Sequence, residues 1–164
     1  MSDYDSAQTG SPTGAYQQYV TVRIGPQLFG LPIQTVHEVF APDSITRVPL
    51  APPAIAGVLN LRGRIVTMLN MRCLLGLPPA EGKGMAVGIE YEGEAFGLMI
   101  DDVGEVLGLD GAKREANPAN LESRWASVAA GVHRLSGGLM LILNVELVLR
   151  GAVAGQPQLA VSGF

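Results

Sequence analysis

Few residues in this chain have the type and spacing that catalysis or metal binding requires. Cys73 is the single cysteine, and its apolar surroundings in MRCLLGL favour a buried, unreactive thiol over a nucleophile. His37 and His133 have no other His or Cys at metal-ligand spacing. Asp101 and Asp102 are adjacent, so in a strand they point to opposite faces, and we interpret them as turn residues. With no glycine-rich phosphate loop, GxSxG or HExxH motif, the sequence predicts no enzyme, no cofactor and no metal site.

Three charged residues are better candidates for a binding surface. Glu38 and Glu105 each interrupt an apolar strand in the pattern V-x-E-V. Strand alternation puts Val36 and Glu38 on one exposed face and Val39 on the other, which makes Val36 and Glu38 a candidate contact patch. Arg62 lies in a predicted turn. We favour a structural role for Arg62, solvated or bonded to free turn carbonyls, over direct binding of a partner.

The chain is a tandem duplication. QLFGLPIQTVHEVF (27–40) recurs as EAFGLMIDDVGEVL (94–107) at an offset of 67, and GVLNLRGRIVTMLNMRCLLG (57–76) recurs as GVHRLSGGLMLILNVELVLR (131–150) at an offset of 74. A copy of about 70 residues is too small to bury a good core alone. We therefore expect one domain over 18–150, with subdomains at about 18–77 and 78–150, and leave open whether the two intertwine. Residues 1–17 are expected to be a disordered leader and 151–164 a loose tail.

Composition excludes several classes of protein. Charged residues make up 16% of the chain, below the roughly 25% of typical domains. The sequence has no apolar run of about 20 residues and no signal peptide, and its one cysteine fits a reducing compartment, so we expect a cytoplasmic protein without membrane insertion. No basic stripe or aromatic platform favours nucleic acid.

Charge is shared unequally between the two copies. Residues 18–77 contain five basic and two acidic residues, and residues 78–150 contain six basic and eleven acidic ones, giving +3 and −5. The difference is either drift on solvated faces or a sign that the halves face different partners.

Short apolar segments between Gly and Pro turns predict an all-β fold, either barrels or a sandwich. Strands are expected at 19–24, 28–33, 36–40, 58–61, 65–69, 85–91, 95–100, 103–107 and 139–143. Asn70 and Asn144 are expected to cap short helices at 71–75 and 145–149.

Residues 18–150 resemble the CheW-type chemotaxis coupling proteins. The segments that support this are GVLNLRGRIVTMLNMRCLLGL (57–77), FGLPIQTVHEV (29–39), FGLMIDDVGEVL (96–107) and LILNVELVL (141–149). Thr67 and Asn70 stand where the family usually has Pro and Asp. The resemblance implies two packed five-stranded Src-homology-3-like barrels with short helices. It also implies a non-catalytic adaptor between the cytoplasmic tip of chemoreceptors and the regulatory domain of the histidine kinase CheA.

The same resemblance implies a protein that is mainly monomeric alone and is recruited to membrane-bound receptor–kinase arrays. Carried over by position, it places receptor contacts at Ile33, Val36, Glu38, Asn60, Leu61, Arg62, Leu98 and Ile100. It places kinase contacts near Val39, Phe40, Ile45, Val106, Leu107 and Leu109.

One hypothesis from a different class stays open. The chain could be a small-ligand or metal-binding β-barrel sensor with a pocket between the copies. Such a pocket needs a few convergent polar groups in an apolar cleft. Glu38, Arg62 and Glu105 are the candidates that the sequence offers.

Overall fold

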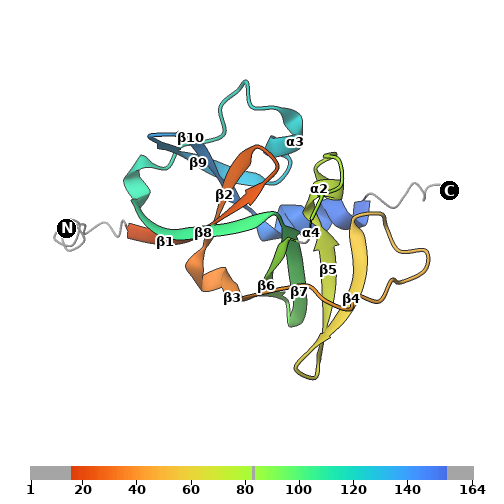
Figure 1. Cartoon of the computed structure of the whole chain (residues 1–164). Helices are drawn as coiled ribbons and strands as arrows, with labels where there is room; N and C mark the ends of the chain where they lie inside the picture. Colours follow the sequence, from red (N-terminus) through yellow and green to blue (C-terminus); the bar gives the residue numbers. More distant parts are fainter. Residues whose placement is uncertain (1–15, 83, 155–164) are drawn as a thin grey trace.

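Two five-stranded sheets and a few short helices make up the computed structural model, which describes residues 16–82 and 84–154 (Figure 1). The strands are β1 (Tyr16–Ile24), β2 (Gln27–Pro32), β3 (Val36–Phe40), β4 (Ile55–Leu61), β5 (Arg64–Asn70), β6 (Met85–Tyr91), β7 (Glu94–Ile100), β8 (Asp102–Asp110), β9 (Ala129–Leu135) and β10 (Gly138–Leu143). The helices are α2 (Met71–Leu74), α3 (Ser123–Ala126) and α4 (Val145–Ala154), with 3-10 turns η1 (Ile33–Thr35) and η2 (Gly111–Lys113). The all-β prediction is confirmed, although neither β9 nor α3 is among the predicted elements.

The two sheets have the same construction. The first sheet has the strand order β8-β1-β2-β10-β9 and the second has β3-β6-β7-β5-β4. Through the repeat, every strand of the first sheet corresponds to the strand at the same place in the second. Each sheet takes two strands from one copy of the repeat and three from the other. The copies are therefore intertwined, and the boundary near residue 77 separates repeats in the sequence and not sheets in space.

Because each sheet contains strands from both copies, the net charge of a sheet differs from the net charge of a sequence copy. The second sheet and its connections comprise residues 36–100, with five basic and six acidic residues. The first comprises 16–35 and 101–154, with six basic and seven acidic residues. Each sheet region has a net charge of −1. The +3 and −5 of the two sequence copies thus give no evidence for electrostatically unlike halves of the folded molecule.

The main core lies between the sheets. Phe29 and Leu31 of the first sheet and Leu69 and Leu98 of the second are fully or almost fully buried in one cluster. Trp125 of α3 completes it, with ring centroids 6.0 Å apart between Phe29 and Trp125. Each such side chain contributes roughly 1.5–3 kcal/mol when buried. This shared core explains how two small copies can be stable together.

Each sheet also curls around a smaller apolar cluster on its opposite face. Met68 and Ala86 belong to the cluster of the second sheet, and Tyr19 and Met140 to that of the first. Neighbours such as Val87, next to Ala86, face the main core, as strand alternation requires. These two clusters are the interiors of the two barrel-like sheets.

Glycines of the repeat allow a passing chain to lie close to each sheet. Gly57 and Gly131 are equivalent and have φ of +148° and +151°. Next to them, Thr46 forms a bridge with Val58 and Glu115 forms one with Val132. A Cβ at Gly57 would lie 2.2 Å from the Thr46 carbonyl oxygen, and one at Gly131 would lie 2.9 Å from that of Glu115. A side chain at either position would collide with the passing backbone.

Helix α4 is longer than the sequence predicts. It continues from Val145 to Ala154, whereas the sequence predicts an end at Leu149 and a loose tail from Gly151. Val148 and Ala152 are buried in the main core, and Gly151 lets the helix approach Leu74 of α2. Burial of this face outweighs the low helix propensity of glycine. At the other terminus, positions 16 and 17 of the predicted leader belong to β1. The rest of the predicted leader and tail lies outside the described residues.

A side-chain clamp connects the two sheets. Arg72 of α2 donates from Nε to Asp101 Oδ1 and from Nη2 to Oδ2, both at 2.8 Å. Asp101 Oδ2 also accepts from the backbone N–H of Gly25, in the β1–β2 turn, at 2.7 Å. The guanidinium of Arg72 also donates to the carbonyl of Pro78 at 2.7 Å. Asp101 is therefore an anchoring residue between α2 and the first sheet and not a simple turn residue.

Candidate functional site

A β-bulge changes the direction of the V-x-E-V segments. In β3 the pairing with β6 shifts between Val36, opposite Ile89, and Glu38, opposite Gly88. The additional residue places Val36 on the face of the main core, where it is partly buried, and turns Glu38 to the opposite face. The prediction that Val36 and Glu38 share one exposed face is therefore wrong.

The same bulge occurs in the second copy. The pairing of β8 with β1 shifts between Val103, opposite Val22, and Val106, opposite Val20. Val103 packs against the main core as Val36 does, and Thr21 donates to the backbone oxygen of Glu105 at 2.7 Å. The two bulges direct Glu38 and Glu105 into equivalent places, between the edge strands of each sheet.

In the second sheet, ion pairs close the space between the edge strands β3 and β4, and we call this space the β3–β4 gap. Arg62, in the β4–β5 turn, pairs with Glu38 of β3. Arg64 donates to Glu90 of β6 at 2.9 Å, and this hydrogen bond, with the charge of Arg64, holds the pKa of Glu90 below its ordinary value. His37 lies 3.5 Å from the same carboxylate. The remaining cavity between the edges has a volume of only about 60 Å³.

Arg62 therefore bridges two edge strands. The hypothesis that it bonds turn carbonyls is wrong, because its partner among the described residues is the carboxylate of Glu38. The side chain of Arg62 is 70% exposed, so this pair has little stabilising effect in water and both charges stay accessible to a partner. Arg62 has φ of +53° and Gly63 of +86°, as a tight hairpin turn requires. Asn60 supports the turn by accepting from the N–H of Gly63 at 2.8 Å.

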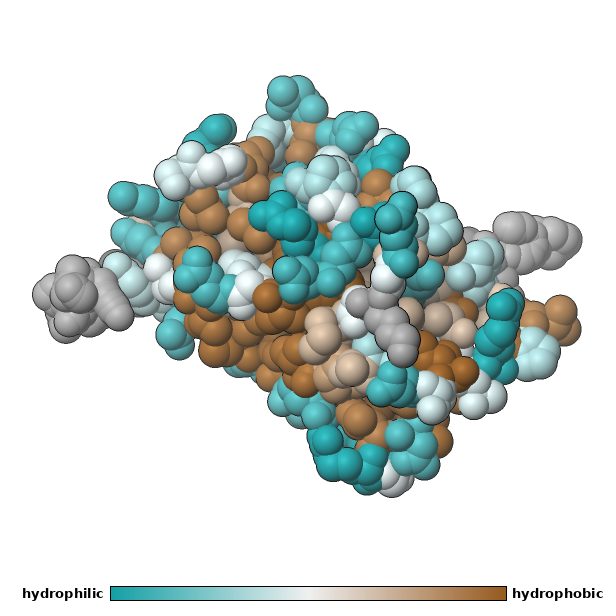
Figure 2. Space-filling view, in the orientation of Figure 1, coloured by the Kyte–Doolittle hydropathy of each residue, from teal (hydrophilic) through white to brown (hydrophobic). Residues whose placement is uncertain are grey.

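Several exposed apolar residues lie on η1 and on the edge strands β3 and β8. Among the residues suggested for receptor or kinase contact, Ile33, Val39 and Val106 are 37%, 39% and 47% exposed. Val39 and Val106 are equivalent in the repeat and lie on the edge strands β3 and β8. Figure 2 shows an apolar band that runs from the region of β1 and β8 toward β3. Single exposed apolar residues are common, but a contiguous band indicates a binding surface.

Other suggested contact residues lie elsewhere. Leu98 and Ile100 are 0% and 4% exposed and belong to the main core, because β7 is the central strand of its sheet. They are not available to a receptor, and that prediction is wrong. Ile33, the equivalent of Ile100, is exposed because β2 ends at Pro32 and η1 turns the chain away. Leu61, also suggested as a receptor contact, is partly buried and packs on the small cluster of the second sheet.

The suggested kinase contacts fall into three groups. Val39 and Val106 are exposed, as described above. Phe40 and Ile45 are partly buried against the small cluster of the second sheet. Leu107 and Leu109 pack partly on the small cluster of the first sheet. Leu107 and Leu109 thus lie in a hollow of the first sheet, whereas Phe40 lines the much smaller corresponding space in the second.

Sequence reasoning misses several exposed apolar residues. Leu50 is 96% exposed with φ of +63°, in the proline-rich segment between β3 and β4, and Val48 nearby is 42% exposed. Ile65 of β5 is 59% exposed. Strand alternation would have placed Ile65 opposite to Val66, which is buried, but no sequence signal distinguishes Leu50 from a core leucine.

The cysteine and histidines considered first lie apart from one another in the fold. Cys73 is exposed, so the prediction of a buried thiol is wrong: the short helix α2 turns Met71 and Leu75 into the core instead. His133 is buried, with its ring 5.6 Å from that of Tyr19, and burial together with nearby Arg114 lowers its pKa. No group of three His, Cys, Asp or Glu residues within 16–82 and 84–154 could hold a metal ion. None of the helices described is long and apolar enough to cross a membrane.

Comparison with known proteins gives a consistent result. Residues 18–153 match the family model described as CheW-like domain. The chain is 25% identical over 138 residues to "Chemotaxis protein CheW" of Rhizobium meliloti (strain 1021), covering 83% of this chain and 89% of that protein. It is 26% identical over 136 residues to the protein of that name from Helicobacter pylori (strain ATCC 700392 / 26695), covering 81% of each. The crystal structure of scaffolding protein TtCheW from Thermoanaerobacter tengcongensis aligns with a TM-score of 0.71 and 27% identity, over 78% of this chain and 88% of that one.

Proposed function

Because this chain belongs to the family of CheW-like domain proteins, we propose that it is a non-catalytic adaptor that couples methyl-accepting chemoreceptors to the histidine kinase CheA. The family and the curated relatives identify a chemotaxis scaffold. The finer assignment of partners rests on the surface of the molecule. In this role the chain binds two proteins at once and brings a kinase to membrane-bound receptors.

The observation that supports the proposal most strongly is the exposed apolar band that runs from β8 toward β3, together with the charge pair of the β3–β4 gap. Ile33 supplies apolar area for the receptor, and Glu38 and Arg62 supply a pair of solvent-accessible, opposite charges. Val39 and Val106, which we propose as kinase contacts, supply further exposed apolar area on the neighbouring edge strands. An apolar centre with charged groups at its rim is typical of a protein-binding surface. An amphipathic receptor helix could place its apolar face on the band and its polar residues against the charge pair.

Kinase binding is proposed at the two barrel-like sheets. The proposed contacts are Val106, Leu107 and Leu109 in the first sheet and Val39, Phe40 and Ile45 in the second. The exposed Val48 and Leu50 add apolar area beside the second sheet. Because the two sheets have equivalent constructions but different exposed residues, one kinase domain can contact each sheet through a different interface. Such heterologous contacts allow adaptor and kinase to alternate in a larger assembly.

The sensor hypothesis is not favoured. The polar residues on which it depends do not converge, because Glu38 and Arg62 pair with each other in the second sheet whereas Glu105 lies on the first. The matched relatives are named chemotaxis protein CheW, which favours the scaffold over a sensor.

The proposal is tested by co-sedimentation of the purified chain with receptor-containing membranes. We expect wild-type protein to sediment with these membranes and Ile33→Arg to remain in the supernatant, since a charge at this exposed receptor contact must lose its hydration on binding. Val153→Arg is the matched control, because Val153 is 60% exposed and belongs to α4, not to η1 or the edge strands β3 and β8. Failure of the wild-type protein to bind either receptor membranes or CheA would exclude the proposed function.

A further inference from the structure

The two equivalent gaps between edge strands differ in how they are closed. In the second sheet, Glu38 pairs with Arg62 across the β3–β4 gap. The repeat places Glu105 and Ser136 at the corresponding positions of the first sheet, between β8 and β9. Glu105 is exposed and has no ion-pair partner among the residues that the structure describes. The carboxylate was kept in both copies, but the cation that neutralises it is present in only one.

The second ion pair of the β3–β4 gap also has no equivalent. Arg64 and Glu90, which pair at 2.9 Å in the second sheet, correspond to Gly138 and Arg23 in the first. Phe40, which fills the second gap, corresponds to the smaller Leu107. The consequence is a difference in volume: the cavity between β8 and β9 measures about 930 Å³, against about 60 Å³ for its equivalent. We call the larger cavity the first-sheet groove.

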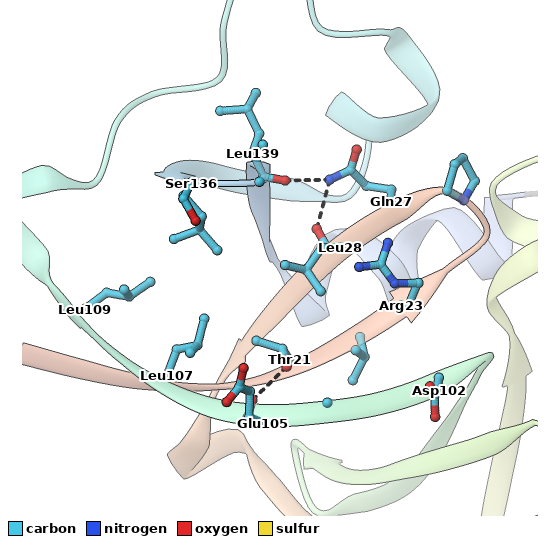
Figure 3. A pocket seen from close by; sticks show the side chains of 16 residues that line it. Thr21, Arg23, Gln27, Leu28, Asp102, Glu105, Leu107, Leu109, Ser136 and Leu139 are labelled. Atoms are coloured by element: carbon cyan, nitrogen blue, oxygen red, sulfur yellow. Dashed lines mark hydrogen bonds between the residues drawn. The ribbon is translucent and has the colours of Figure 1, made fainter.

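The groove has an apolar floor and a polar rim (Figure 3). The floor is formed by leucines from four strands: Leu28, Leu107, Leu109, Leu135 and Leu139. The rim includes the carboxylates of Asp102 and Glu105 and the guanidinium of Arg23. Figure 3 shows the carboxylate of Glu105 beside Thr21 and Leu107, with Ser136 on the other side of the hollow. The position across from Glu105 that an arginine takes in the second sheet is thus taken by a short hydroxyl side chain.

We propose that the first-sheet groove binds a partner segment that presents an arginine next to apolar side chains, and that this arginine pairs with Glu105 as Arg62 pairs with Glu38. The molecule itself supplies the model for this chemistry, because the β4–β5 hairpin with Leu61 and Arg62 closes the equivalent gap within the chain. The apolar part of the segment lies on the leucine floor, and the guanidinium lies between Glu105 and Ser136. An unpaired carboxylate above an apolar floor favours a cationic and apolar partner over an acidic one.

The inference deepens the proposed function, because Leu107 and Leu109 are among the residues proposed to contact the kinase. It specifies the chemistry of one contact: an arginine-bearing hairpin turn on the partner. The gap is closed in the second sheet and open in the first. The adaptor can therefore receive such a turn at the first sheet only, and its two sheets are not interchangeable for the partner.

The test uses a synthetic hairpin peptide as the probe and measures its binding to the full chain. The peptide VLNLRGRIVT, closed into a ring by D-Pro-Gly, presents the arginine of the β4–β5 turn, and a second peptide has citrulline in place of this arginine. Binding is followed through backbone amide chemical shifts in the isotope-labelled chain. We expect shifts centred on Glu105, Leu107, Leu135 and Ser136, and a three- to tenfold loss of affinity, roughly, for Glu105→Gln or for the citrulline peptide.

Two further variants make the result specific. Ser136→Arg supplies the missing cation within the chain, so it should weaken peptide binding as Glu105→Gln does, while its exposed turn position leaves the fold intact. Glu92→Gln makes the same charge change in the β6–β7 turn of the other sheet and should leave peptide affinity unchanged. Because Glu105 and the peptide arginine act on each other, combining Glu105→Gln with the citrulline peptide should add no further loss.

The outcomes separate this inference from the proposed function. Absence of shifts at the groove up to millimolar peptide, or equal affinity of wild type and Glu105→Gln, would overturn the inference. If CheA still binds the chain in that case, the adaptor function stands and only the chemistry of the groove is wrong. If the peptide binds as expected but CheA and receptors do not, the groove is assigned correctly and the proposed function fails.

Discussion

Replacing Asp101 by Asn should weaken the connection between the two sheets. Both carboxylate oxygens of Asp101 are acceptors: Oδ1 accepts from Arg72 Nε, and Oδ2 accepts from Arg72 Nη2 and from the N–H of Gly25. In the Asp101→Asn variant one of these oxygens becomes an NH₂ group that faces donors whichever way the amide is turned. The substitution therefore removes the charge and at least one accepted hydrogen bond without changing the size of the side chain.

The expected loss can be bounded from burial. The side chains of Arg72 and Asp101 are 22% and 24% exposed, so the pair lies between a surface ion pair and a buried one. Exposed pairs contribute about 0.2–1 kcal/mol, and breaking a buried pair costs roughly 3–5 kcal/mol. We expect a loss of about 2 kcal/mol in the free energy of unfolding, or roughly 4–8 °C in Tm for a domain of this size.

The pH dependence gives an independent check. The hydrogen bond from Arg72, with that from Gly25, holds the pKa of Asp101 below its ordinary value despite partial burial. A carboxyl whose pKa is lowered by folding stabilises the protein above its unfolded pKa of about 3.9, and this stabilisation is lost as the pH falls through the folded value. The difference in stability between wild type and Asp101→Asn should be complete at pH 7 and should shrink below about pH 4.

Urea unfolding at a series of pH values measures this difference directly. Asp102→Asn is the control, since the neighbouring carboxylate is exposed and accepts only from the N–H of Val103. A variant Asp101→Asn as stable as Asp102→Asn at pH 7, or a deficit that persists unchanged at pH 3, would show that the clamp does not stabilise the fold as described.

Three further substitutions follow from the same structure. Arg62→Ala should cost less than about 1 kcal/mol in unfolding free energy, because its pair with Glu38 is exposed, yet it should weaken receptor binding; a large drop in Tm would contradict this. Val36→Asp should destabilise the fold by roughly 2 kcal/mol or more, since Val36 packs against the main core. A Tm equal to that of wild type would show that Val36 is exposed, as simple strand alternation predicts. Gly57→Ala should destabilise more than Gly131→Ala, because the added Cβ lies 2.2 Å from a backbone oxygen in one case and 2.9 Å in the other; chemical unfolding that ranks them in reverse would refute the packing argument.

The sequence predicts where the strands lie along the chain better than it predicts which strands share a sheet. The alternation and turn signals place most of the strands, and the duplication correctly indicates two equivalent units. What the repeat cannot show is which copy a strand pairs with, because β1 and β2 fit the edge of either β3 or β8 equally well as sequence patterns. Pairing is decided by the core that forms between the sheets, with Phe29 and Leu98 from different copies in one cluster.

The candidate site shows the same limit at the level of single residues. The sequence correctly singles out Glu38, Arg62 and Glu105 as unusual, but a bulge of one residue reverses the faces of Val36 and Glu38. Bulges have no reliable signal in a single sequence, and here the residue at the bulge is His37 in one copy and Gly104 in the other. The ion pair of Arg72 with Asp101 is likewise invisible, since 29 positions of sequence separate residues that the fold brings together.

We propose that this chain makes a kinase responsive to receptors by binding both. The most direct measurement is the rate of CheA autophosphorylation in the presence of receptor-containing membranes, with and without the purified chain. We predict that the rate rises only when receptors, kinase and this chain are all present, and that a receptor ligand then changes this rate. A kinase rate that is unaffected by the chain at saturating concentration, although both partners are active with a coupling protein from their own system, would contradict it.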